Sequence, residues 1–94
     1  MKGIVGRPTA GARLAVEKAE EGAQAIVYRG FVHLPDADVT AEARVELPGG
    51  AVKVTLGPGG TPELEKSAAA LLRAATKALV AAGSPLPRKI VRWR

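Results

Sequence analysis

TPELEKSAAALLRAATKALVAA, residues 61–82, is the stretch that decides the fold of this chain. Thr61 suits the N-cap, because its hydroxyl accepts a hydrogen bond from an orphan amide, and Pro62 suits the first helical position. Gly83 follows as a natural left-handed residue, and Pro85 prevents the helix from continuing. The spacing therefore predicts one long α-helix over residues 61–82.

The predicted helix has an apolar stripe and a basic face. At about 100° per residue, the apolar side chains fall on one broad stripe in which leucine alternates with alanine. The stripe consists of Leu64, Ala68, Leu71, Leu72, Ala75, Leu79 and Ala82. A stripe of mixed leucine and alanine lets a helix pack closely on a β-sheet, so we expect Leu71 and Leu79 to be buried against a sheet.

Turn signals divide the residues before this helix into short strands. They recur at residues 20–22, 35–38, 48–50 and 57–60, about a dozen residues apart, which suits consecutive antiparallel hairpins. Residues 39–47 are the clearest strand, because apolar and polar side chains alternate along them. The sequence predicts an α+β fold: an antiparallel β-meander of about four strands with the long helix on one face.

Residues 13–21 are compatible with a strand or a helix, and the regular turn signals favour the strand. With a helix there, the order would be αβββα, which is that of double-stranded-RNA-binding domains. The run GPGGTPELEKSAAALLRAATKAL resembles the glycine-rich loop and second helix of that family, although Glu63 and Glu65 stand where the family places lysines. The resemblance covers one loop and one helix.

The chain divides into three predicted parts. Residues 1–12 hold three glycines and Pro8 and are expected to be a flexible lead-in. Residues 13–84 form the single α+β domain. Residues 85–94, PLPRKIVRWR, are a basic arm that is either free or paired with a sheet edge as a further strand.

Composition narrows the class of protein. Ninety-four residues with 47% hydrophobic content make one small domain, and the absence of cysteine excludes disulfide and thiolate chemistry. We find no apolar leader at the start and no run of about 18 apolar residues, so we expect a cytoplasmic protein. The heavy use of Ala, Gly, Arg and Pro suggests a GC-rich, bacterial genome.

No stretch matches a catalytic, cofactor or metal site. The glycine loop at residues 57–60 precedes a helix, but Glu63 and Glu65 would repel a phosphate there. His33 is the only histidine, and no nucleophile stands near it in sequence. We therefore predict no catalytic residue, no cofactor and no metal ion, and expect a protein that is not an enzyme.

Charge gives the strongest indication of function. The formal net charge is +5, of which residues 1–87 contribute +1 and the last seven residues +4. Lysine and arginine neutralise phosphates, and a tryptophan stacks on bases, so we expect binding of RNA or DNA through the arm and the basic helix face, which is about 16 Å long. The candidate residues are Lys66, Arg73, Lys77, Arg88, Lys89, Arg92, Trp93 and Arg94.

A homo-oligomeric interaction module is the alternative. Val27 and Phe31 alternate with Ile26 and Tyr28 in the second predicted strand. Unless a bulge at Gly30 turns them inward, they form an apolar outer patch, which is typical of interfaces. This reading predicts a homodimer through the sheet face around Val27 and Phe31.

Overall fold

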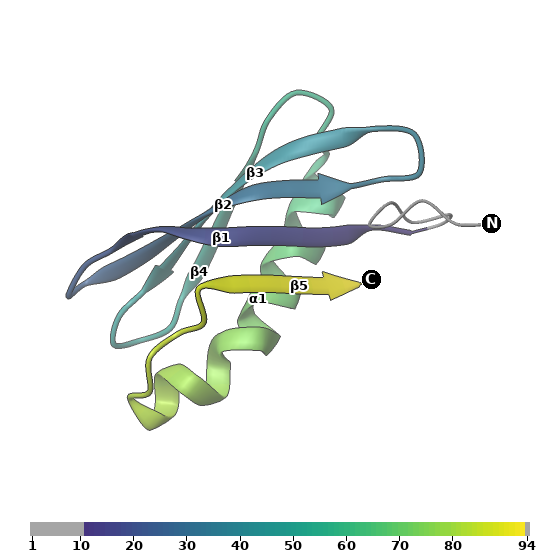
Figure 1. The fold of residues 1–94 in the computed structure, drawn as a ribbon. Helices are drawn as coiled ribbons and strands as arrows, with labels where there is room; N and C mark the ends of the chain where they lie inside the picture. The colour runs from purple at the N-terminus through teal and green to yellow at the C-terminus, as the bar shows by residue number, and fades with distance from the viewer. Residues whose placement is uncertain (1–10, 94) are drawn as a thin grey trace.

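The computed structural model describes residues 11–93, which form one antiparallel sheet and one helix (Figure 1). The chain runs through four strands, then the helix, then a fifth strand. The elements are β1 (Arg13–Glu21), β2 (Ala25–His33), β3 (Asp38–Glu46), β4 (Val52–Leu56), α1 (Pro62–Ala82) and β5 (Lys89–Trp93). The predicted α+β fold is confirmed, with the end of the chain forming a fifth strand.

The sheet has the order β4-β3-β2-β1-β5, with every neighbouring pair antiparallel. Four strands follow one another as a meander, and β5 returns to pair with β1. Because residues 13–21 form β1, the helical alternative and its αβββα order are excluded. Most of the predicted lead-in, residues 1–10, and Arg94 lie outside the described residues.

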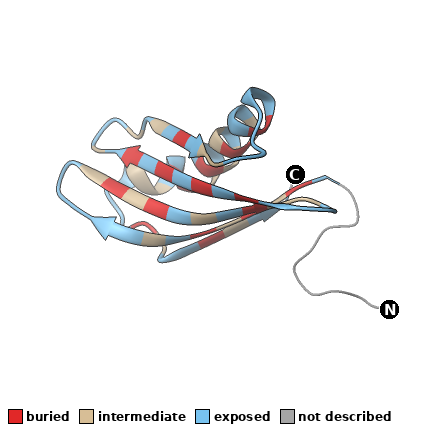
Figure 2. Cartoon of the chain, turned by 90° about the horizontal axis from the view of Figure 1, so that it is seen from above, coloured by how far each residue is buried: buried red, intermediate tan, exposed pale blue. Residues whose placement is uncertain are grey.

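Helix α1 covers one face of the sheet and leaves the other open, as the strands passing in front of α1 in Figure 1 show. Buried and exposed residues alternate along the strands (Figure 2), as expected for a sheet with one covered face. In β3 the buried members are Val39, Ala41, Ala43 and Val45. We call the side of the sheet away from α1 the open face.

The caps of α1 agree with the sequence. Thr61 Oγ1 accepts a hydrogen bond from the Leu64 amide at 3.1 Å, and Gly83 takes a left-handed φ of 68°. The amide of Gly83 donates to the Val80 carbonyl at 3.1 Å. These contacts satisfy groups that a helix end otherwise leaves unpaired.

The buried stripe of α1 is rotated relative to the prediction. Leu64, Ala68, Leu72 and Thr76 are the buried residues, and Leu71 and Leu79 are only partly buried. Ala82, predicted in the stripe, is exposed. Thr76 was missed because its hydroxyl looks polar in the sequence, yet it is buried and donates to the Leu72 carbonyl at 2.9 Å.

Candidate functional site

The basic end of the chain is held in the sheet as β5. Its register with β1 runs from Glu17 opposite Lys89 to Arg13 opposite Trp93. The Lys18 amide also donates to the Arg88 carbonyl at 2.7 Å, one residue before β5 begins. Of the two predicted alternatives for residues 85–94, a free arm or a paired strand, the structure has the strand.

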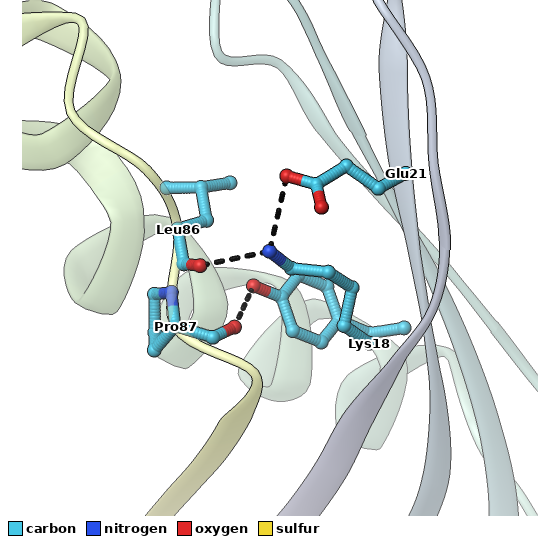
Figure 3. Close-up of polar contacts among 5 residues, drawn as sticks. Lys18, Glu21, Leu86 and Pro87 are labelled. Carbon is cyan, nitrogen blue, oxygen red and sulfur yellow. Dashed lines mark hydrogen bonds and ion pairs between the residues drawn. The ribbon is translucent and has the colours of Figure 1, made fainter.

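Side chains of β1 and β2 anchor the linker that leads into β5 (Figure 3). The Tyr28 hydroxyl donates to the Pro87 carbonyl at 2.5 Å. The Lys18 ammonium donates to the Leu86 carbonyl at 2.9 Å and to Glu21 at 3.2 Å. Burial, and secondarily the charge of Glu21, raises the pKa of Tyr28 above its usual value, so the hydroxyl keeps its proton as a donor.

Alternation in β5 divides its side chains between two faces. Ile90 is buried in the core, and Lys89, Val91 and Trp93 therefore point to the open face. Arg92 is exposed on the helix side of the same edge, where its guanidinium donates to the Val91 carbonyl at 2.8 Å. That bond uses one of five guanidinium donors, so Arg92 both covers a carbonyl and retains donors for a ligand.

The candidate residues on α1 lie away from the β5 edge. Lys66, Arg73 and Lys77 are all exposed on the solvent side of the helix. Because α1 lies on the face opposite Lys89 and Trp93, the predicted set falls into two groups. One group lies at the β5 edge and consists of Arg88, Lys89, Arg92 and Trp93. The other group is the three helix cations. Arg94 lies outside the described residues.

Ion pairs are concentrated on the open face. Arg29 donates to Glu42 at 2.7 Å and to Glu20 at 3.0 Å, and its hydrogen bond to Glu42 contributes most to raising the pKa of Arg29. Arg44 pairs with Glu46 at 3.3 Å. These contacts pair Glu20 of β1 and Glu42 and Glu46 of β3 with arginines.

The candidate cations, in contrast, have no such partners. Within residues 11–93, none of them forms an ion pair with another described side chain; they are Lys66, Arg73, Lys77, Arg88, Lys89 and Arg92. On α1, Arg73 and Lys77 also repel each other at i,i+4 spacing. These six cations are therefore not neutralised by an ion pair within residues 11–93, and Lys89 has Glu17 opposite it in the sheet.

Two aromatic side chains stand on the open face near β5. Phe31 is 44% exposed and Trp93 57%, and these are the exposed large apolar residues of the described chain. The Phe31 ring stacks on His33 with 5.8 Å between ring centroids, and the Arg13 guanidinium lies 5.7 Å from the centre of Trp93. Sequence reasoning included Trp93 but missed Arg13, because this contact depends on the β1–β5 register.

Phe31 also borders a shallow groove of the open face. The groove crosses β2, β3 and β4 and is open to solvent. Its lining includes Arg29, Phe31, Thr40, Thr55 and Gly57. Gly57 lets the chain approach β3 closely, since a Cβ there would meet the Thr40 side chain. The groove thus presents an aromatic ring, two hydroxyls and the Arg29–Glu42 ion pair.

Other features add no further class of site. Within the described range, no cluster of three or more His, Asp or Glu side chains is placed to hold a metal ion. The only helix in that range is not apolar enough to cross a bilayer. No family model matches the chain, and neither a curated protein nor a solved structure is similar to it.

Proposed function

We propose that the protein is a non-enzymatic, cytoplasmic nucleic-acid-binding protein whose main contact surface is the β5 edge. The observation that carries this proposal is a group of three cations, next to the exposed ring of Trp93, that form no ion pair with any residue of the described range 11–93: Arg88, Lys89 and Arg92. Lysine and arginine gain affinity by releasing counterions from phosphates, and a tryptophan stacks on bases of any sequence. RNA and DNA both offer this chemistry.

The helix cations form a secondary contact surface for the ligand. Lys66, Arg73 and Lys77 face the other side of the molecule, so a ligand reaches both groups only by passing around the β5 edge. Arg92 points to the helix side of that edge and supports such a path. A short oligonucleotide is expected to contact β5 alone.

The test is a titration of labelled RNA and DNA oligonucleotides at several salt concentrations. Three phosphate contacts at the β5 edge predict a log–log salt slope of about −2 to −3. Replacing both Lys89 and Arg92 by glutamine should reduce the magnitude of this slope by about 1.5 to 2. Point substitutions are preferable to deletion, because deleting residues 88–94 would remove a whole strand of the sheet.

Lys53→Gln is the matched control. Lys53 is an exposed cation of β4, at the opposite edge of the sheet, and forms no ion pair with another residue of the described chain. Its substitution should leave affinity and slope unchanged. Binding weaker than ~100 μM at low salt, the weak end of non-specific nucleic-acid binding, would refute the proposal.

A homodimer through the sheet face is the second candidate. It is supported by the outward direction of Val27 and Phe31, since β2 is regular at Gly30 and the register shift lies in β1, between Lys18 and Glu20. Sedimentation of the parent and of Phe31→Glu tests it. A dimeric parent with a folded, monomeric variant supports this function, and a monomeric parent rejects it.

A further inference from the structure

The open face is organised as cross-strand rows. One row runs across β3, β2, β1 and β5 through Thr40, Phe31, Ala15 and Val91. The next row, toward the end of β5, runs through Asp38, His33, Arg13 and Trp93. Phe31 and Trp93 therefore stand in neighbouring rows, two strands apart.

Two residues of β1, Ala15 and Arg13, stand between the strands that carry the two rings. Two strand spacings separate them by about 10 Å across the sheet. Ala15, which is opposite both Phe31 and Val91, lies between them with only a methyl group. Ala15 leaves room beside Phe31, and both rings are partly exposed, so they remain accessible to flat ligands.

Each ring already has a partner that fixes its orientation. His33 stacks against Phe31, and the guanidinium of Arg13 lies over Trp93. The His33 ring is also bonded to Asp38, at 2.8 Å between Nδ1 and Oδ1. Neither ring is covered by these partners, because both stay about half exposed. A held, exposed ring loses little side-chain entropy when it stacks on a ligand.

The two rings have different polar surroundings. Beside Phe31 lies the groove with the hydroxyls of Thr40 and Thr55, which both donate and accept hydrogen bonds. Beside Trp93 lie the cations of β5. Base edges suit the first environment, and phosphates suit the second.

We infer that the open face binds unpaired bases, so that the ligand is a single-stranded nucleic acid with one base on Trp93 and another in the groove at Phe31. This inference rests on the proposed function and narrows its ligand. A single strand exposes the faces of its bases to aromatic side chains, whereas a duplex keeps them stacked on one another. The phosphates then follow Lys89 and Arg92.

Charge favours this ligand over a second copy of the chain. The row beside the rings contains Glu42, Arg29, Glu17 and Lys89, all exposed. A protein interface that buried the rings would have to bury this charged row too, and interface cores are depleted in charge. A base in the groove at Phe31 would contact only the Arg29–Glu42 end of this row, where the two charges are already paired.

The experiment compares three probes on the full chain: an unstructured oligonucleotide of about ten nucleotides, the duplex of the same sequence, and inorganic polyphosphate. Trp93 is the only tryptophan, so its fluorescence reports directly on stacking. We expect quenching by the single strand and much less by polyphosphate. Anisotropy of the labelled oligonucleotides should show tighter binding of the single strand than of the duplex.

Two variants at one position separate stacking from packing. Phe31→Leu keeps an apolar side chain without a ring and should weaken single-strand binding by about 5- to 150-fold, the range for losing one stacked base. Phe31→Tyr keeps the ring and should bind like the parent. Circular dichroism checks that both variants are folded.

The outcomes separate this inference from the proposed function. If single strand and duplex bind equally and Phe31→Leu has no effect, the inference is overturned while nucleic-acid binding stands. If neither oligonucleotide binds at low salt, both are overturned. Selective single-strand binding that requires a ring at position 31 supports both.

Discussion

Gly30 is a residue of β2 at which a side chain would collide with the backbone of β1. A Cβ there would overlap the Ala15 carbonyl oxygen and lie 2.7 Å from the Val16 Cα, both backbone atoms of β1. We expect Gly30→Ala to lower the free energy of unfolding by about 1–3 kcal/mol, because a strand would have to shift.

Gly49→Ala is the control for Gly30→Ala. Nothing lies within 4 Å of a Cβ at Gly49. Urea unfolding of both variants measures the difference. Equal stabilities would contradict the close approach of β1 and β2 at Gly30.

Tyr28 joins the sheet to the linker before β5. Tyr28→Phe removes the donor to the Pro87 carbonyl and is expected to cost about 1–3 kcal/mol. Its effect on β5 can be followed by hydrogen exchange of the Ile90 amide. Unchanged stability and exchange would show that this bond does not hold the linker.

The raised pKa of Tyr28 leads us to expect that the free energy of unfolding depends on pH in the alkaline range. Because burial raises its pKa in the folded protein, the unfolded chain loses this proton first. The contribution of protonated Tyr28 to the free energy of unfolding is therefore fully present below about pH 10 and is lost as the pH rises through the raised pKa. The urea midpoint of the parent should fall more steeply above this pH than that of Tyr28→Phe, and parallel curves would contradict the assignment.

At the scale of elements, α1 stabilises the sheet through a narrow set of side chains. Leu72 is fully buried and Leu71 only partly. We expect Leu72→Ala to cost about 2–5 kcal/mol and Leu71→Ala clearly less. Thermal or urea unfolding of the two neighbouring variants checks which side of α1 faces the core, and the reverse order would contradict the packing described.

Local patterns were sufficient to predict most elements. Thr61, Pro62 and Gly83 mark the ends of α1, and the alternation in β3 reproduces its buried face. These signals depend on neighbours in the chain. The rotation of the α1 stripe was not predictable from them, because the buried position of Thr76 depends on its hydrogen bond to Leu72 and on the sheet beneath.

The candidate site depended more on long-range contacts. The sequence predicted the basic cluster and Trp93, but not that Arg13 would face Trp93 or that Phe31 would stand near them. That arrangement requires β5 to pair with β1, about 75 residues earlier in the chain, a contact that periodicity does not contain. The division of the cations between β5 and α1 likewise required the sheet order.

At the scale of the whole molecule, the two faces have different roles in our account. Helix α1 closes one face and packs against the core residues of the sheet, and the open face carries the rings, the groove and paired charges. The β5 edge lies between the two sides and holds cations that form no ion pair with the part of the chain that the structure describes. Binding should therefore be centred on one edge of the sheet and extend over the open face.

An NMR titration of the isotope-labelled full chain with an unpaired oligonucleotide of about ten nucleotides tests this central claim most directly. We predict the largest shifts at the amides of Lys89, Val91 and Trp93, at the Trp93 indole and at Phe31, with little change at Lys53. Shifts confined to α1 around Lys66, Arg73 and Lys77, or a titration without shifts, would contradict the account.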